Sequence, residues 1–186
     1  QGLVISHPDI YSFASDNQRV IQRTNKPKNK VGIVSGGGSG HLPVFTGYVG
    51  KGMLDACAVG SVFASPSVDQ IASAIRNGNN GSGVLCVLGN YGGDVMNFEM
   101  ACEIVKSEGI ETKMIIVSDD IASASNEDKL KRRGIAGLIF AFKIAGASSE
   151  NGASLEEVYD LTLKANNNLR TIGVAVSSCI LPEVGK

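Results

Sequence analysis

The chain contains no tryptophan, and among its 186 residues there are only two histidines and five prolines. Its 17 basic and 18 acidic residues nearly cancel, which gives a formal net charge of -1. A direct nucleic-acid partner is not expected, because no basic stripe with interleaved aromatic residues is present. A membrane is not expected either, because no apolar run reaches the length of about 20 residues that spans a bilayer. Gln1 to Asn29 also lack the features of a signal peptide.

The sequence has four cysteines and no closely spaced cysteine pair that could form a zinc site. Cys57, Cys86, Cys102 and Cys179 are widely separated, and most lie in apolar runs, which is typical of buried, reduced thiols. We therefore expect a cytoplasmic protein that binds no metal. Because 43% of the residues are hydrophobic, the chain is long enough for one good core and too short for two comfortable domains.

Strand-like and helix-like segments alternate from Val31 onward. Residues 1–30 are polar and predict a peripheral segment, with a helical turn around Asp9 to Phe13. Apolar runs of strand length lie at Val31 to Val34, Ala56 to Val59, Val84 to Leu88, Thr112 to Val117 and Ile172 to Ser177. Helical patterns follow Ser67, Asp94, Gly134 and Ser154. This alternation predicts an α/β fold with a doubly wound, mostly parallel sheet and helices on both faces. In such sheets ligands bind beyond the carboxyl ends of the strands, so the candidate loops are Ser35 to His41, Gly60 to Pro66 and Gly89 to Asn97.

A glycine cluster, Gly36 to Gly40, follows the first apolar run and ends at His41. The pattern predicts a strand, a tight loop and a helix that begins near Val44. Glycines would allow positive φ angles and close approach of a ligand to the backbone, and the first amides of the helix would face that ligand. The loop lacks the Lys-Ser/Thr ending of a nucleotide-binding P-loop and matches the dinucleotide fingerprint poorly. A tight turn without a ligand is the alternative.

A second glycine-containing loop runs from Gly89 to Asn97 and places Asp94 at the start of a helix. In a parallel sheet, Asp94 and His41 would meet at one edge, where they could hydrogen-bond a small polyol or ketone and move a proton. The alternatives are that His41 caps a helix or bonds a backbone carbonyl, and that Asp94 is an N-cap. Asp119 and Asp120 follow the fourth strand, but no third ligand has a clear spacing, so a loop or capping role is favoured over a metal site.

A basic run, Lys129 to Arg133, precedes an apolar helix. A solvated loop or helix start is the favoured interpretation, with a docking surface as the alternative.

Several motifs together resemble the dihydroxyacetone kinase family. They are Gly36-Gly37-Gly38-Ser39-Gly40-His41, Gly47 to Ala56, Ser65-Pro66, Gly93 to Phe98, Arg132 to Gly137 and Gly173 to Cys179. The resemblance covers residues 31–186 and implies the ketose-binding first domain of a K subunit, with the second domain apparently absent. In this family the K part binds dihydroxyacetone or a related short ketose. A separate L subunit or domain holds ADP or ATP with Mg, and phosphoryl groups come from ATP or from the phosphotransferase system.

The resemblance also implies roles for individual residues. Gly38, Ser39, Gly40 and His41 would contact the ketose, with His41 as a hydrogen-bonding acid or base. Asp94 would bond the attacking hydroxyl and help deprotonate it. A homodimer is also implied.

Two positions depart from the family pattern, and one expected residue is missing. Leu42 stands where the family often has glutamate. Gly89 stands where the family commonly has a lysine that contacts the substrate. The loss of that lysine supports an alternative function, a ketose-binding paralogue that activates a transcription regulator. A family histidine that binds the ketose covalently lies in the second domain, so this chain alone is expected to bind ketose weakly. A dinucleotide-binding enzyme is the third hypothesis.

Overall fold

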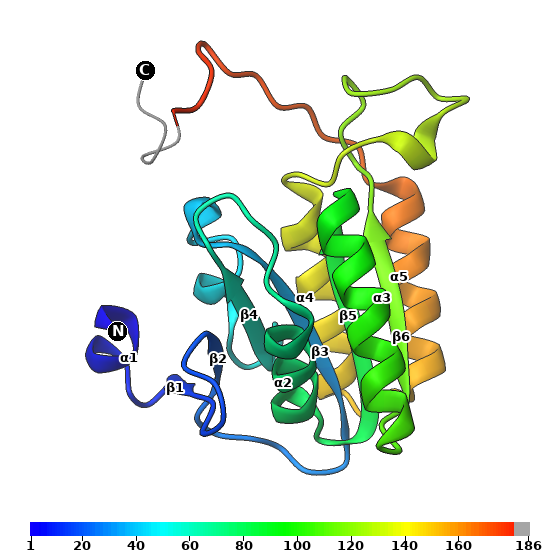
Figure 1. The fold of residues 1–186 in the computed structure, drawn as a ribbon. Coiled ribbons are helices and arrows are strands. Elements are labelled where there is room, and N and C mark those ends of the chain that lie inside the picture. The colour runs from blue at the N-terminus through cyan, green and yellow to red at the C-terminus, as the bar shows by residue number, and fades with distance from the viewer. Residues whose placement is uncertain (181–186) are drawn as a thin grey trace.

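The computed structural model describes residues 1–180 and contains a six-stranded sheet. The strands are β1 (Tyr11–Phe13), β2 (Val20–Arg23), β3 (Lys30–Gly38), β4 (Ala56–Gly60), β5 (Gly81–Gly89) and β6 (Thr112–Val117), arranged in the order β1-β2-β4-β3-β5-β6 (Figure 1). Strands β4, β3, β5 and β6 are parallel, and β2 and β1 extend the sheet in antiparallel pairings. The carboxyl ends of the four parallel strands therefore share one edge.

Two pairs of helices cover the two faces of this sheet (Figure 1). Helices α2 (Val68–Gly78) and α3 (Gly92–Ser107) pack on one face, and α4 (Gly137–Glu150) and α5 (Leu155–Asn168) pack on the other. Ser67 and Ser154 cap α2 and α5 through capping boxes, as their sequence patterns predict. The predicted α/β fold with helices on both faces is confirmed, and the sheet is mixed because of its two antiparallel strands.

The first thirty residues contribute to the sheet, which corrects the expectation of a peripheral segment. Helix α1 (Gly2–Ser6) lies earlier than the predicted helical turn, and Tyr11–Phe13 form strand β1 instead. All four residues of β2 are buried, and Val20 to Gln22 pair with β4. The polar composition was misleading because two of the basic side chains here, Arg23 and Lys30, are buried in ion pairs.

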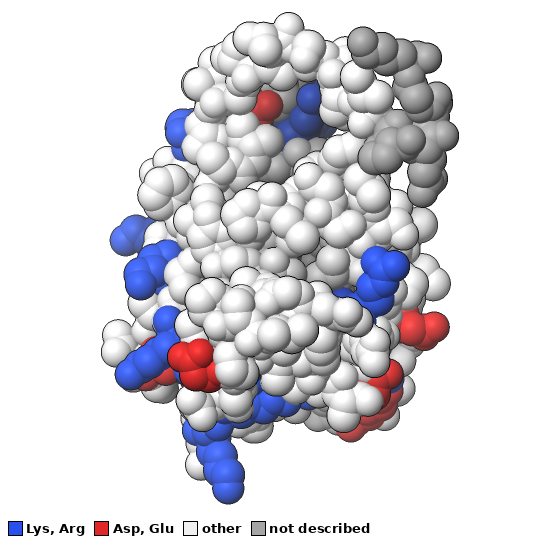
Figure 2. Space-filling view, turned by 90° about the vertical axis from the view of Figure 1, so that its left-hand side faces the viewer, with Lys and Arg blue, Asp and Glu red and all other residues white. Residues whose placement is uncertain are grey.

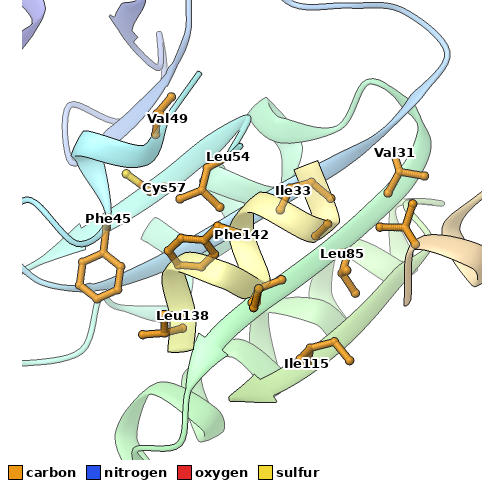
Figure 3. Packing of buried hydrophobic residues seen from close by; sticks show 14 of the residues in the cluster. Val31, Ile33, Phe45, Val49, Leu54, Cys57, Leu85, Ile115, Leu138 and Phe142 are labelled. Carbon is orange, nitrogen blue, oxygen red and sulfur yellow. The ribbon is translucent and has the colours of Figure 1, made fainter. Parts of the chain in front are cut away.

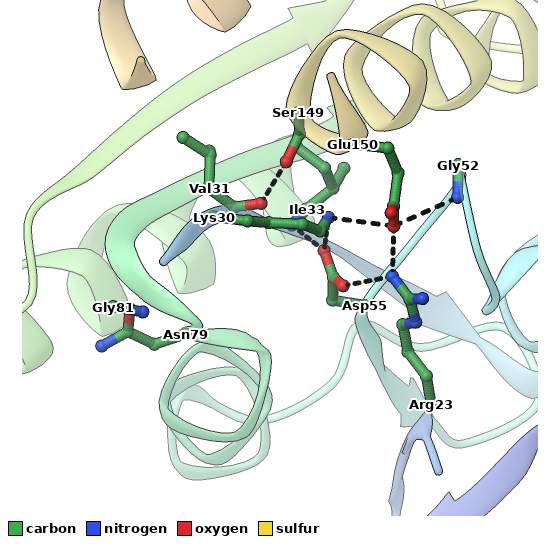
Figure 4. A network of polar contacts seen from close by, with 10 residues as sticks. All are labelled: Arg23, Lys30, Val31, Ile33, Gly52, Asp55, Asn79, Gly81, Ser149 and Glu150. Carbon is green, nitrogen blue, oxygen red and sulfur yellow. Dashed lines mark hydrogen bonds and ion pairs between the residues drawn. The ribbon is translucent and has the colours of Figure 1, made fainter. Parts of the chain in front are cut away.

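These ion pairs form one network at the amino-terminal edge of the parallel strands (Figure 4). Asp55 accepts hydrogen bonds from Arg23, Lys30 and the backbone N–H of Ile33. Glu150, the last residue of α4, also pairs with Arg23 and Lys30. Two strand starts and a helix end are thus joined at the edge opposite the carboxyl ends of the strands.

The hydrophobic core consists of two clusters, one on each face of the sheet. The first cluster packs Leu138 and Phe142 of α4 against Ile33 and Leu85 of the sheet (Figure 3). The second packs α2 and α3 around Phe98, which is completely buried. Burial on both faces explains why β3 and β5 read as continuous apolar runs rather than as alternating patterns.

The predicted fifth strand, Ile172 to Ser177, is wrong. Thr171 makes one isolated bridge to Asp120, and no residue from Ile172 to Ile180 belongs to a strand. Val174 is 86% exposed, so within the described residues its apolar side chain has little surface to pack against. The final residues of the resemblance, 181–186, lie outside the described residues.

Candidate functional site

A cavity of about 710 Å³ lies at the carboxyl edge of the parallel strands, where the sequence predicted a ligand site. Its floor comes from the ends of β3 and β5, and its walls come from the loops after β4 and β5 and from the start of α4. The lining residues are Gly36, Gly37, Gly38, His41, Val44, Phe45, Phe63, Ala64, Ser65, Gly89, Tyr91, Gly93, Asp94, Gly134, Ile135, Ala136, Leu138 and Ile139. A few polar groups thus face a mostly apolar enclosure, which is typical of small-molecule sites.

Gly36, Gly37 and Gly38 belong to a strand rather than a loop, which corrects the first sequence expectation. Strand β3 continues through Gly38, and none of Gly36 to Gly40 has a positive φ angle. These glycines are needed for close packing instead. A Cβ atom on Gly37 would lie 2.2 Å from Cζ of Phe45, and one on Gly38 would lie 2.6 Å from the carbonyl oxygen of Val62. The absence of side chains here leaves the cavity floor open.

No α-helix follows the glycine cluster, so the predicted anion-facing helix start is also wrong. Between β3 and β4 the chain forms two 3-10 turns, η1 (Ser39–His41) and η2 (Thr46–Tyr48). The backbone N–H groups of Ser39 and Gly40 donate to the carbonyl groups of Ser61 and Val62. Those two amides are therefore occupied within the chain, and neither Ser39 nor Gly40 lines the cavity.

Asp94 is the acidic residue among those that line the cavity, and it is partly buried. Helix α3 begins after Tyr91, its N-cap, and Asp94 stands in the first turn. The carboxylate accepts a hydrogen bond of 2.6 Å from Oγ of Ser65, so the alternative role of Asp94 as an N-cap is wrong. Burial raises the pKa of Asp94 above its ordinary value, while the Ser65 hydrogen bond and the nearby His41 oppose that rise. A raised pKa makes the carboxylate a better proton acceptor.

His41 lines the same cavity from the opposite loop. Its ring packs against Phe63, with 5.3 Å between the ring centroids, and its side chain makes no hydrogen bond to any described residue. The alternatives of a helix cap or a carbonyl bond are therefore not found in the described part of the chain. His41 and Asp94 share one cavity, as the sequence predicted, and their ionisable groups are close enough to influence each other.

Gly89 also lines the cavity, beside Tyr91. A Cβ atom at Gly89 would lie 3.0 Å from Cε2 of the Tyr91 ring and 3.3 Å from the carbonyl oxygen of Gly134. This position has little room for a side chain unless the tyrosine ring moves. The space expected for a family lysine is thus bordered by a phenol, whose pKa is raised mainly by burial.

Several residues that line the cavity were not predicted from the sequence. The loop Gly60 to Pro66 was a candidate, but no role was predicted for Ser65, whose bond to Asp94 joins two segments distant in sequence. Phe63 and Tyr91 were also missed as cavity residues. Both could have been predicted as cavity residues, because each is an aromatic residue that closely follows the carboxyl end of a parallel strand.

Asp119 holds the α4 wall of the cavity in place. Its buried carboxylate accepts hydrogen bonds from the backbone N–H groups of Ile135, at 2.9 Å, and Gly137, at 2.8 Å, and from the hydroxyl of Thr171. Asp120 accepts a bond from the backbone N–H of Ala122. The predicted loop or capping role of both aspartates is confirmed.

The described residues offer neither a metal centre nor a membrane-spanning helix. Residues 1–180 contain no group of three or more histidine, cysteine or acidic side chains arranged to hold a metal ion. None of the helices in the same range is long and apolar enough to cross a membrane.

The chain is similar in sequence to subunits of dihydroxyacetone kinases. The dihydroxyacetone-binding subunit DhaK of PTS-dependent dihydroxyacetone kinase 1 from Listeria innocua is 49% identical over 185 residues, covering 100% of this chain and 56% of that protein. The corresponding Lactococcus lactis subunit is 46% identical over 185 residues, covering 100% of this chain and 55% of that protein. The chain thus spans about half the length of these relatives.

Solved structures give the same result. The dihydroxyacetone kinase from C. freundii, in complex with AMP-PNP and Mg2+, matches with a TM-score of 0.89 and 41% identity, over 97% of this chain and 34% of that one. The dihydroxyacetone kinase operon co-activator Dha-DhaQ matches with a TM-score of 0.79 and 34% identity, over 88% of this chain and 50% of that one. The Dak1 domain family matches residues 1–186, and the chain belongs to that family.

Proposed function

We propose that this chain binds a short ketose such as dihydroxyacetone and presents one of its hydroxyl groups for phosphorylation. The observation that carries the proposal is the pairing of Asp94 and His41 in one cavity at the carboxyl edge of the sheet. The family match and the kinase names of the relatives support the same activity. A ketose of three or four carbons offers hydroxyl and carbonyl oxygens that these side chains could hydrogen-bond.

In the proposed reaction Asp94 accepts the proton of the attacking hydroxyl. The hydroxyl oxygen then forms a bond to the transferred phosphorus as the bond to the leaving nucleoside diphosphate breaks. Burial favours this role because it raises the pKa of Asp94, and Ser65 fixes the orientation of the carboxylate. His41 would hydrogen-bond a second ketose oxygen from the opposite loop. The apolar side chains of Phe45 and Ile139 limit water at the reacting groups.

The remaining partners belong to the same proposal. A nucleotide-binding L subunit or domain would hold ADP or ATP with Mg, which supplies the transferable phosphoryl group. The chain itself would hold no cofactor, act in the cytoplasm and form a homodimer. Gly38 and Gly89 would lie beneath the ketose, because both line the cavity without a side chain.

The experiment is a phosphoryl-transfer assay of the full-length protein with dihydroxyacetone, with and without an L partner and ATP. We expect Asp94→Asn and His41→Asn to lower turnover by at least about a hundredfold, since general acid–base catalysis contributes about 10²–10⁴. Asp128→Asn is the matched control, because this carboxylate lies on an exposed loop. Wild-type turnover that survives in Asp94→Asn would refute the assigned role.

A ketose-sensing coactivator is the second candidate, and Gly89 favours it because the family lysine is missing. The similarity to the co-activator Dha-DhaQ supports this candidate. Binding of dihydroxyacetone without turnover under any phosphoryl donor, together with recovery of a DNA-binding regulator in a pull-down, would select it. The kinase is favoured because its structural match has the higher TM-score and identity.

A further inference from the structure

The cavity has no permanently charged cation of its own. Among its lining residues there is no lysine or arginine. In Figure 2 the middle of the face is uncharged, and the hollow above it shows both basic and acidic atoms. Phosphoryl transfer develops negative charge on the transferred oxygens, and enzymes neutralise it with arginine, lysine or metal ions. A cation next to the cavity, on a residue that does not line it, would neutralise this negative charge.

The backbone of Arg133 is fixed next to a residue of the cavity wall. Its N–H donates to Oγ of Ser123 at 3.0 Å, and its carbonyl accepts from the N–H of Asp120 at 3.0 Å. The next residue, Gly134, lines the cavity and packs directly on Gly89. A Cβ atom at Gly134 would lie only 2.6 Å from the Cα atom of Gly89. The arginine is thus held one residue from the cavity wall.

The side chain of Arg133 is exposed and forms no ion pair within residues 1–180. The neighbouring basic residues differ in this respect. Arg132 is buried and donates from Nε to the carbonyl of Ala124 at 3.0 Å, and Lys131 pairs with Asp128 at 2.8 Å. Arg133 therefore combines a fixed backbone with a guanidinium group that remains available to a ligand.

The charge of Arg133 reaches the cavity electrostatically. Tyr91 lines the cavity, and burial raises the pKa of its phenol. Arg133 opposes that rise, whereas Asp119, Asp120 and Asp94 add to it. The guanidinium group is thus near enough to act on a group that would border the ligand.

We propose that Arg133 binds the phosphoryl group at the cavity mouth, both during transfer and in the ketose phosphate product. This inference rests on the proposed function and assigns it a residue that acts on phosphate rather than on the ketose. Guanidinium groups suit this role because their paired N–H donors match phosphate oxygens.

The test compares binding of dihydroxyacetone and dihydroxyacetone phosphate to the full-length protein by calorimetry. We expect Arg133→Ala to weaken binding of the phosphate by about tenfold, since it removes charge-assisted hydrogen bonds that exposure to solvent already weakens. Affinity for unphosphorylated dihydroxyacetone should remain unchanged. Arg133→Lys should restore part of the loss, and Lys131→Ala is the control that removes an equal charge from the same loop.

A second readout is independent of ligand binding. The pKa of Tyr91, followed by NMR on protein with labelled tyrosine, should rise in Arg133→Ala and stay constant in Lys131→Ala. Equal affinity of wild type and Arg133→Ala for the phosphate would overturn the inference and leave the proposed ketose binding intact. Failure of the wild type to bind either compound would overturn the proposed function, and this inference with it.

Discussion

Replacing Asp55 with asparagine tests whether the buried ion network holds the amino-terminal edge of the sheet together. The Asp55 side chain is 2% exposed and lies 3.1 Å from Nη1 of Arg23 and 2.8 Å from Nζ of Lys30. It also accepts the N–H of Ile33 at 2.8 Å. Asparagine has nearly the same shape and can keep one of these bonds, but it removes the charge that balances two buried cations.

The expected loss of stability follows from the burial of both partners. Removing one member of a buried ion pair costs about 3–5 kcal/mol, because the other charge is left uncompensated. Glu150 still faces Arg23 and lies 3.6 Å from Lys30, so the lower end of that range, about 3 kcal/mol, is expected. In a domain of this size the Tm falls by about 2–4 °C for each kcal/mol of lost stability, so we expect the Tm to decrease by about 6–12 °C.

The assay is urea and thermal unfolding followed by far-UV circular dichroism. Glu108→Gln is the matched control, because Arg76 and Glu108 form a two-bond ion pair whose side chains are 40% and 37% exposed. Exposed pairs contribute about 0–1 kcal/mol. Equal effects of Asp55→Asn and Glu108→Gln would refute the reasoning, because burial would then not determine the cost.

Three further predictions concern the cavity. Gly37→Ala should lower the free energy of unfolding by about 1–3 kcal/mol, because its Cβ atom would meet the Phe45 ring, whereas Gly92→Ala, with nothing within 4 Å, should cost nothing measurable in urea unfolding. Ser65→Ala removes the hydrogen bond that lowers the pKa of Asp94, so the acid limb of the pH–rate profile should move to higher pH; an unchanged limb would contradict this. Burial raises the pKa of Asp94 in the folded chain, so folding takes up protons above pH 3.8 and the ionised carboxylate lowers stability at neutral pH. Asp94→Asn should therefore raise the Tm at pH 7, and the gain should shrink as the pH falls toward 3.8; a lower Tm would show that the carboxylate is stabilising.

The sequence predicted the parallel centre of the sheet and its four main helices because each of these has a strong local signal. Buried parallel strands read as apolar runs, and Ser67 and Ser154 mark helix starts through capping boxes. Strand β2 was missed because its polar residues are buried by partners that come from other parts of the chain. The N–H of Arg23 bonds Asp55, and its side chain reaches Glu150, 127 residues further on.

The candidate site was predicted in outline and not in detail. His41 and Asp94 were placed together because a parallel sheet brings the ends of neighbouring strands to one edge. The conformation of Gly36 to Gly40 was predicted wrongly, because a glycine needed for a turn and a glycine needed for close packing look the same in sequence. Only the positions of Phe45 and Val62 distinguish the two cases.

The contacts of Asp119 give this domain a mechanical linkage. One carboxylate holds both the cavity wall, at Ile135 and Gly137, and the residue from which the final segment departs, Thr171. In Figure 1 that segment leaves the body of the fold at the carboxyl end of the parallel strands. A displacement of Thr171 would therefore disturb the same carboxylate that fixes the backbone of Ile135 and Gly137 at the cavity wall.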